Sequence, residues 1–296
     1  MNLFYIWNSI LTKSEMNKIL LIIASFIMAG SISAQTMHQS AATQRSVLIS
    51  QDSLKADVQK EVDMKMYPVL WHQTSAEYRA LCYQAFNAAK TYIETLIPNR
   101  EPNEKFAIIT DLDETIIDNS YLEAKQIKEG KEYNNARWKE WVNMSAATEV
   151  PGAIEFLQWA ASRNITIFYI SNRSVSDVKA TLANMKKLQL PNADEEHMLF
   201  LSTESTKEPR RQIVAKDHKI VMLMGDNLND FTNLFEKKSI DDRKAETDKV
   251  KDEWGKKFIV LPNAIYGEWE NAFYDYKRNL TPKEKEAKRK DLLKVY

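Results

Sequence analysis

Five short apolar runs recur along the chain, and each is rich in β-branched and aromatic residues. They cover residues 106–110, 165–170, 198–201, 220–224 and 258–261. Each run is continuous rather than alternating between apolar and polar positions, which is typical of strands buried on both faces of a sheet. Stretches with helical periodicity lie between them, for example at residues 152–163 and 174–188. This alternation predicts an α/β fold built on a doubly wound parallel sheet.

Other segments do not belong to this alternation of strands and helices. Apolar side chains recur at helical spacing over residues 75–97, and Pro98 ends the pattern, so we predict an amphipathic helix there. Residues 121–148 form a polar and aromatic insertion. We expect one domain over residues 52–296, with a charged, solvated helix at residues 281–294. Its smaller helical cap is expected to combine residues 52–98, 119–150 and part of 263–296.

The N-terminal region predicts export. Lys18 precedes an apolar run of eleven residues, 19–29, and small residues follow it up to Ala34. This is the pattern of a secretory signal peptide, because a membrane-spanning helix needs about 20 apolar residues. An uncleaved N-terminal helix is the alternative interpretation. We expect a periplasmic or secreted protein with no stable membrane anchor.

The signal-peptide pattern also divides the N-terminal region. Met16 lies directly before the charged residue that opens the pattern, so we expect translation to start there. The expected divisions are an upstream extension at residues 1–15, a signal peptide at residues 16–34 that is cleaved near Ala34, and a flexible linker at residues 35–51.

Composition narrows the classes of function. Forty-one basic residues balance forty-one acidic ones, which removes the electrostatic argument for a nucleic acid polymer as a partner. The single cysteine, Cys82, excludes an intramolecular disulfide and a zinc site with several cysteines. Six glycines and the absence of a glycine-rich phosphate-loop motif disfavour nucleotide binding of that kind. A small-molecule substrate fits best, and the sequence leaves a homo-oligomer open.

Acidic side chains follow two of the predicted strands. Asp111 and Asp113 come directly after the run at 106–110, and Asp226 and Asp230 follow the run at 220–224. Ligands of open α/β sheets bind beyond the carboxyl ends of the strands, so we expect these four side chains to meet there. Carboxylates so close together need a cation, and oxygen ligands favour Mg²⁺. The sequence therefore predicts a magnesium site.

The same residues support phosphoryl transfer. A carboxylate such as Asp111 can attack phosphorus and form an aspartyl-phosphate. Asp113 is then the acid that protonates the leaving oxygen and the base that activates water. The phosphoryl oxygens would be held by Ser171, the adjacent Asn172 and Lys207.

Four ordered motifs resemble those of the haloacid dehalogenase (HAD) superfamily. They are Asp111-Leu112-Asp113-Glu114-Thr115, then Ser171-Asn172-Arg173, then Lys207, and finally Gly225-Asp226-Asn227-Leu228-Asn229-Asp230-Phe231. Flanking segments at residues 71–78, 118–120, 138–142, 151–156 and 262–269 resemble the class C acid phosphatases, which are secreted or lipid-anchored 5′-nucleotidases of bacteria. The chain departs from lipid-anchored members because it lacks the cysteine that accepts the lipid.

This resemblance implies roles for individual residues. Asp111 would be the nucleophile and a metal ligand, and Asp113 would bind the metal through its main-chain carbonyl. Asp226 would be the third protein ligand. Asp230 would bind through water or orient its neighbours.

The leaving group is less well specified by the sequence. Tyr133, Trp138 and Tyr266 either stack on a nucleobase or fill the interior of the cap. We expect Asp118, Asn119 and Ser120 to cap a helix. The favoured function is hydrolysis of phosphomonoesters, including nucleoside 5′-monophosphates, by an exported Mg²⁺-dependent acid phosphatase. A phosphotransferase on the same scaffold and a non-catalytic surface-binding module are the alternatives.

Overall fold

The computed structural model describes residues 14–18, 21–22, 24–26, 28, 55–201 and 203–296. The chain divides into two units, residues 1–57 and 58–296. The expected extension apart from residues 14 and 15, the expected cleavage point and the expected linker lie outside the described residues. The described residues between 14 and 28 are helical. Among the described residues, no helix is both long enough and apolar enough to cross a membrane.

A five-stranded parallel sheet forms the centre of the larger unit, as the sequence predicts. Its strands lie in the order β5-β4-β1-β6-β7. Their bounds are β1 (Phe106–Thr110), β4 (Thr166–Ser174), β5 (Met198–Leu201), β6 (Lys219–Gly225) and β7 (Phe258–Val260). Because β1 occupies the middle of the sheet, the residues that follow it lie between those that follow β4 and β6.

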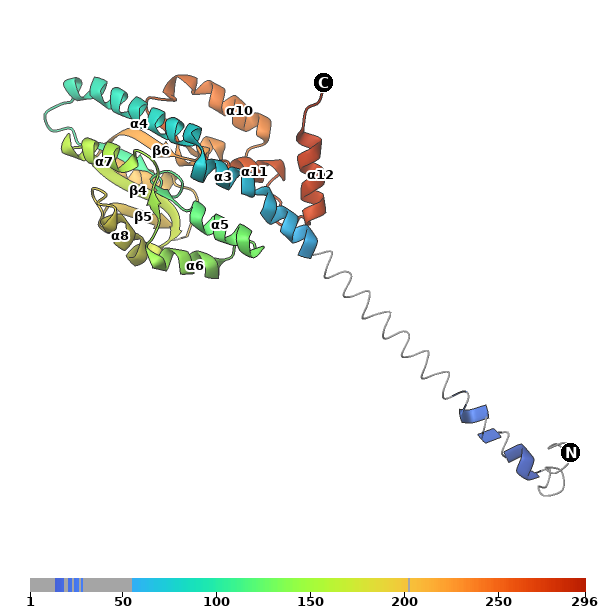
Figure 1. Cartoon of the computed structure of the whole chain (residues 1–296). Helices are drawn as coiled ribbons and strands as arrows, with labels where there is room; N and C mark the ends of the chain where they lie inside the picture. The colour runs from blue at the N-terminus through green and yellow to red at the C-terminus, as the bar shows by residue number, and fades with distance from the viewer. Residues whose placement is uncertain (1–13, 19–20, 23, 27, 29–54, 202) are drawn as a thin grey trace. The chain divides into compact units, whose positions relative to one another are not determined.

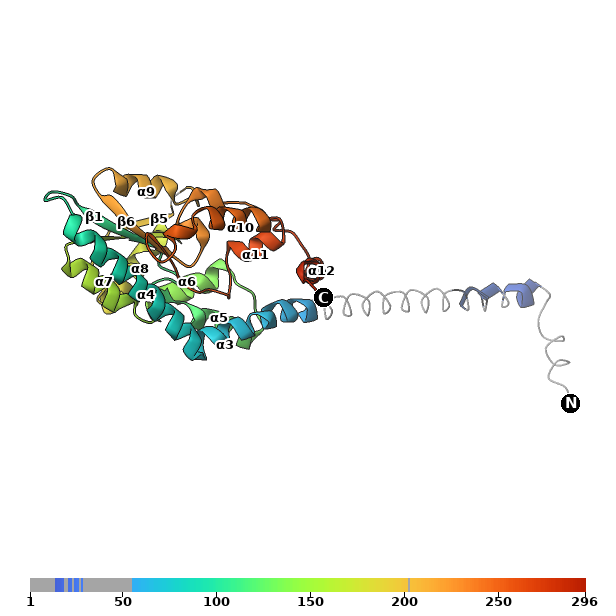
Figure 2. The ribbon, with the colours of Figure 1, turned by 90° about the horizontal axis from the view of Figure 1, so that it is seen from above.

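Helices cover both faces of this sheet, which confirms the doubly wound architecture (Figures 1 and 2). Every residue of β1 is buried. Phe106 and Ile108 join the apolar cluster under one helical layer, whereas Ala107 and Ile109 join the cluster on the opposite face. The first layer contains α4 (Ala76–Leu96), α7 (Ala153–Ser162) and α8 (Val178–Lys187), and α9 (Glu208–Ala215) lies on the other side.

The predicted amphipathic helix is α4, and its ends follow from local chemistry. The Ser75 hydroxyl accepts a hydrogen bond from the Tyr78 N–H at 3.1 Å and caps the helix. Pro98 lies in the short 3₁₀ turn, Ile97–Asn99, that ends it. The apolar side chains on one face of α4, Cys82 among them, are buried in the cluster that covers the sheet, whereas Leu81 is exposed. Residues 52–98 were expected to belong to the cap. Within that segment, α4 instead packs on a face of the sheet.

The insertion forms two helices over the carboxyl ends of the strands. They are α5 (Ser120–Glu129) and α6 (Asn135–Met144). A two-stranded antiparallel ribbon of β2 (Ile117–Asp118) and β3 (Thr148–Glu149) joins the two ends of the insertion. α3 (Met66–Thr74), which follows a helical stretch at residues 55–64, packs against α5.

The helix expected over residues 174–188 begins later than its periodicity indicates. β4 continues to Ser174 and a 3₁₀ turn at Val175–Asp177 precedes α8. The pairing of β4 with β5 shifts register between Ser171 and Ser174. Such a bulge re-aims side chains at the end of a strand, and here Ser171 and Arg173 reach Asp113, which follows β1.

The C-terminal third completes the larger unit. The elements β6 and β7 are joined by 3₁₀ turns at Leu228–Asp230 and Asn233–Phe235 and by α10 (Ile240–Lys249). After β7 come α11 (Glu268–Phe273) and α12 (Pro282–Leu292). No residue of α12, all of which the structure describes, is buried, as expected of a solvated helix. Arg289 nevertheless anchors it through an ion pair with Glu61 and a 2.8 Å hydrogen bond to the Tyr274 hydroxyl.

Candidate active site

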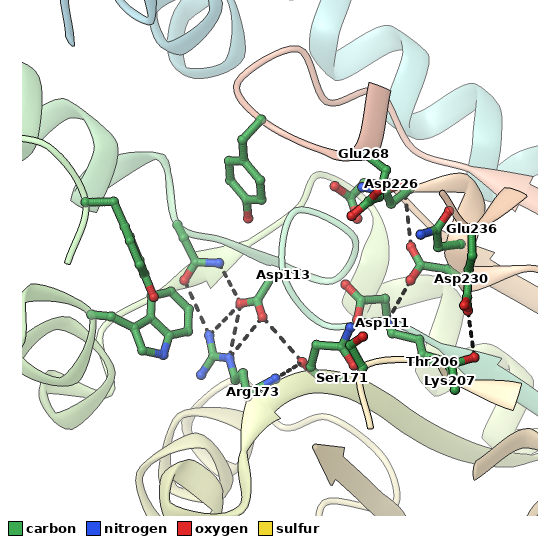
Figure 3. Close-up of a pocket in the computed structure, with 18 of the residues that line it drawn as sticks. Asp111, Asp113, Ser171, Arg173, Thr206, Lys207, Asp226, Asp230, Glu236 and Glu268 are labelled. Carbon is green, nitrogen blue, oxygen red and sulfur yellow. Dashed lines mark hydrogen bonds and ion pairs between the residues drawn. The ribbon is translucent and has the colours of Figure 1, made fainter. Parts of the chain in front are cut away.

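A cavity of about 530 Å³ opens at the carboxyl ends of β1, β4 and β6 (Figure 3). All ten residues that the sequence nominated for the site line this cavity. They are Asp111, Asp113, Tyr133, Trp138, Ser171, Asn172, Lys207, Asp226, Asp230 and Tyr266. The sheet thus brings together side chains that are far apart in the chain.

Three carboxylates converge on one side of the cavity. One oxygen each of Asp111, Asp226 and Asp230 lies within 4.8 Å of the others. Asp111 directly follows β1, and its N–H donates to the Met224 carbonyl of β6 at 2.9 Å. Asp226 directly follows β6. The strand pairing itself therefore sets the separation of Asp111 from Asp226.

Asp230 reaches the same point by a tight turn. The N–H of Asn227 donates to its carboxylate at 3.0 Å, which closes the turn after β6. This carboxylate lies against the Cα of Gly225, in the space that a side chain at that position would occupy. Glycine at the end of β6 is therefore required by this close approach.

The loop after β1 carries Asp113 away from the three converging carboxylates. Glu114, which follows Asp113, has a left-handed φ of 55°. Its N–H donates to the Ile117 carbonyl at 2.8 Å, and its buried carboxylate accepts the N–H of Asn119 at 2.8 Å. The turn separates Asp113 from Asp111 although only Leu112 stands between them. In Figure 3, Asp111 lies between the pair Asp113 and Arg173 on one side and Asp226 and Asp230 on the other.

Lys207 is buried and bridges two of the carboxylates. Its ammonium group donates to Asp111 and lies 2.6 Å from Asp230 Oδ1. Burial alone would lower the pKa of Lys207, but the two carboxylates outweigh it and the pKa is raised. Lys207 therefore remains a cation inside the cavity, next to Asp111.

Asn263 was missed by the sequence analysis and supports Asp226. Its side-chain amide donates to Asp226 Oδ2 at 2.7 Å, and its own oxygen accepts the Ile265 N–H at 2.8 Å. The Thr115 hydroxyl donates to the other oxygen of Asp226 at 3.4 Å. Asn263 lies just after β7, so the rule that polar residues follow the strands of such a sheet would have identified it.

The expectation that Asn119 caps a helix is wrong for its side chain. Asn119 stands at the N-cap position of α5, but its side chain makes no capping hydrogen bond. Its amide instead donates to Asp113 Oδ1 at 2.7 Å. The neighbouring Asp118 accepts the Ser120 N–H at 2.8 Å and so satisfies that end of the helix. The competing acceptor, Asp113, lies too far back in the chain for a local capping pattern to reveal it.

Arg173 is the second residue that the sequence analysis left without a role. Its guanidinium group forms an ion pair with Asp113 at 2.8 Å. The Ser171 hydroxyl is 3.4 Å from the same carboxylate, while the exposed Asn172 lines the cavity and its side-chain oxygen accepts from Arg210 at 2.6 Å. Asp113 is thus held on the side of the cavity that faces β4 and the insertion.

The aromatic residues nominated for stacking come from the insertion and from the segment before α11. Tyr133 and Trp138 lie with ring centroids 6.5 Å apart. The indole N–H of Trp138 donates to Asp177 at 3.3 Å. Tyr266 is far from both in the sequence, and the Lys65 ammonium group lies 6.0 Å from the centroid of its ring. All three rings line the cavity, and the Tyr133 side chain is half exposed.

Burial and repulsion from neighbouring carboxylates disfavour the charged forms of Asp111 and Asp226. Burial, together with the charges of Asp230 and Asp113, raises the pKa of Asp111 from 3.8 to about 7, against the opposing effect of Lys207. The pKa of Asp226 is raised well above its ordinary value, first by burial and then by Asp230 and Asp111. One lysine therefore does not neutralise the group, and the three oxygen donors fit a divalent cation.

A doubly wound sheet with these carboxylates beyond β1 and β6, and a buried lysine before α9, defines an enzyme of the HAD superfamily. The family model described as "HAD superfamily, subfamily IIIB (Acid phosphatase)" matches residues 25–269. The chain belongs to this family of acid phosphatases and is a phosphomonoesterase. Enzymes of the superfamily generally use a divalent metal.

Two solved structures support the same assignment. The chain is similar to the class C acid phosphatase from Bacillus anthracis, with 39% sequence identity and a TM-score of 0.76. The match covers 79% of this chain and 98% of that one. The same enzyme with tungstate bound matches with the same identity, coverage and TM-score.

The raised pKa values predict a stability profile for the metal-free protein. A carboxyl group whose pKa is higher in the folded state stabilises that state below its unfolded pKa, and this contribution is lost as pH rises through the folded pKa. For Asp111 this interval runs from 3.8 to about 7. In the presence of a chelator, we therefore expect the melting temperature to fall as pH rises from 5 to 8. Saturating Mg²⁺ should raise the melting temperature more at pH 8 than at pH 5.

Thermal unfolding monitored by circular dichroism at each pH checks this expectation. Asp226→Asn is the matched variant, because it removes one charge from the group and should flatten the decline in chelator. If the melting temperature measured in chelator stays unchanged or rises between pH 5 and pH 8, the electrostatic description of the site is contradicted.

Proposed function

We propose that the protein is an exported, Mg²⁺-dependent acid phosphatase that hydrolyses phosphomonoesters through an aspartyl-phosphate on Asp111. The observation that carries this proposal is the position of Asp111, which lies in the cavity against both Lys207 and the carboxylates of Asp226 and Asp230. The nucleophile, a lysine that attracts a phosphoryl anion and carboxylates that would hold a cation therefore meet in one place. Export rests on the apolar run at residues 19–29 and the small residues after it.

Mg²⁺ would be held by the carboxylates of Asp111 and Asp226 and by the Asp113 carbonyl, with Asp230 acting through water or orienting its neighbours. Oxygen donors of this kind are the ligands that Mg²⁺ prefers. When bound, the ion supplies positive charge that offsets the repulsion between the anionic nucleophile and the anionic phosphate. Asn263 and Thr115 fix Asp226, as outer hydrogen bonds commonly orient metal ligands.

The protein side chains carry the chemical steps. Asp111 attacks phosphorus, and Lys207 stabilises negative charge on the phosphoryl oxygens. Ser171 and Asn172 are expected to bind the same oxygens from the β4 side. Asp113 donates a proton to the leaving oxygen and later accepts one from the water that hydrolyses the phosphoenzyme. The similar enzyme from Bacillus anthracis holds tungstate, which is a tetrahedral oxyanion like phosphate.

Replacement of the nucleophile gives the direct test. Asp111→Asn keeps the size of the side chain and removes its nucleophilic oxygen, so kcat for p-nitrophenyl phosphate in Mg²⁺ should fall by at least about 1,000-fold. Acid quenching with a ³²P-labelled substrate should trap a phosphoenzyme in the parent and none in this variant. Asp241→Asn, a change at a fully exposed aspartate, is the matched control and should retain parental kcat.

Parental turnover by Asp111→Asn would contradict the covalent mechanism. A labelled phosphoenzyme that persists in that variant would assign the nucleophile to another residue.

We also propose that nucleoside 5′-monophosphates are substrates and that Trp138 and Tyr266 stack on the base, with Tyr133 beside Trp138. All three rings line the same cavity as Asp111, and all three come from segments outside the strands of the sheet. Aromatic faces bind bases without regard to sequence, at about 1–3 kcal/mol for each stacked base. A phosphomonoester with an aromatic leaving group would therefore gain affinity that a small alkyl phosphate does not.

This proposal predicts a substrate-dependent effect on KM. Trp138→Ala and Tyr266→Ala should each raise KM for adenosine 5′-monophosphate by about tenfold, while KM for glycerol 2-phosphate should change by less than about twofold. Tyr121→Ala is the control, because Tyr121 is an exposed aromatic residue of the same insertion that stacks on Trp141 outside the cavity lining. Equal increases in KM for both substrates would assign these rings to packing of the cap.

A further inference from the structure

Arg173 is a buried cation that the proposed mechanism does not use. Its side chain is 3% exposed, and burying a charged group is costly unless it is paired and hydrogen-bonded. The sequence places it two residues after Ser171, at the bulge where β4 shifts register against β5. The N–H of Arg173 donates to the Ser171 hydroxyl at 3.1 Å, which fixes the main chain there.

The guanidinium group contacts Asp113 through two of its nitrogens. Nε donates to both carboxylate oxygens, at 3.1 and 3.2 Å, and Nη2 donates to Oδ1 at 2.8 Å. Contacts of this forked kind fix the plane of a carboxylate as well as its distance. The orientation of the Asp113 carboxyl group is therefore set by Arg173.

The remaining contacts of Arg173 hold the guanidinium group itself in place. Nη1 donates to the buried Thr181 hydroxyl at 2.9 Å, and Nη2 also reaches the side-chain oxygen of Asn119 at 3.3 Å. The same Asn119 oxygen accepts the Trp141 indole N–H at 2.8 Å. The Trp138 ring lies 5.0 Å from the guanidinium carbon and covers it.

This network favours a positioning role over binding of the phosphoryl group. The N–H groups of Arg173 that the structure pairs are directed at Asp113, Thr181 and Asn119, whereas Lys207 lies at the carboxylate of Asp111. A residue that bound the phosphoryl group would be expected beside Asp111. Arg173 instead pairs with Asp113, the residue proposed to act as both acid and base.

We propose that Arg173 is a positioning residue that aims the Asp113 carboxyl group at the leaving-group oxygen; this inference rests on the proposed function of Asp113. In the first half-reaction an Asp111 oxygen forms a bond to phosphorus while the bond from phosphorus to the leaving oxygen breaks. The proton of Asp113 moves to that oxygen, giving the free alcohol and the Asp113 carboxylate. Misalignment of Asp113 then harms most those substrates whose leaving group needs the proton.

The dependence of rate on the leaving group tests this inference. p-Nitrophenolate is a stable anion that departs with little help from an acid, whereas an alkoxide must be protonated. In Arg173→Met, kcat/KM for glycerol 2-phosphate should fall by about 100-fold or more, a typical contribution of general acid catalysis. For p-nitrophenyl phosphate the fall should stay below about tenfold.

The conservative variant and a matched control sharpen the test. Arg173→Lys, which keeps the charge but not the fork, should show the same selective loss at reduced size. Arg137→Met makes the same change at an arginine of the insertion that pairs with Glu129 and does not line the cavity, so it should show no selective loss. Since both substrates are assayed on one preparation, the ratio of their kcat/KM values is independent of the fraction of folded enzyme.

Asp113→Asn separates failure of this inference from failure of the proposed function. The account expects the same selective loss in Asp113→Asn and no additional loss when Arg173→Met is combined with it. A selective loss in Asp113→Asn alone, with Arg173→Met affecting both substrates equally, would overturn the role of Arg173. The absence of selective loss in Asp113→Asn would overturn the acid role of Asp113 itself.

Discussion

The site depends on one electrostatic constraint, the convergence of two buried carboxylates and one half-buried carboxylate within reach of a common cation. Asp111, Asp226 and Asp230 have oxygens within 4.8 Å of one another, and burial with mutual repulsion raises the pKa of Asp111 and Asp226. Lys207 offsets part of this repulsion. Such a group is unfavourable on its own and becomes favourable when it holds a divalent ion and an anionic substrate, so the cost of burial is linked to the function of an acid phosphatase.

The parallel sheet makes this arrangement possible because its central strand delivers two carboxylates with different roles. The β1 strand ends between β4 and β6, and the turn at Glu114 directs Asp113 toward Arg173 while Asp111 remains beside Asp226. The cavity is thereby divided into a side with the acidic cluster and a side with the proposed acid and base. The insertion supplies the aromatic wall on the latter side, next to the expected position of the leaving group.

Most of the fold, and the carboxylates, lysine and aromatic residues of the site, could be predicted from the sequence because both follow from local patterns. Continuous apolar runs marked all five strands of the sheet, and polar residues after them marked the site. The roles of Asn119, Arg173 and Asn263 were not predicted, because each depends on how the chain folds beyond a strand. The acceptor of Asn119 lies six residues back across the turn at Glu114, and the partners of Arg173 and Asn263 follow other strands of the sheet. Asn119 shows this most clearly. Its local context indicates a helix cap, but its side-chain amide donates to Asp113 instead.

The most direct measurement is a crystal structure of the protein grown with Mn²⁺, whose anomalous scattering identifies and locates the ion. Mn²⁺ binds the same oxygen ligands as Mg²⁺. The account predicts one strong anomalous peak in the cavity, about 2 Å from a carboxylate oxygen of both Asp111 and Asp226. An ordered crystal of the Mn²⁺-activated enzyme whose anomalous peak lies away from these two oxygens would contradict it.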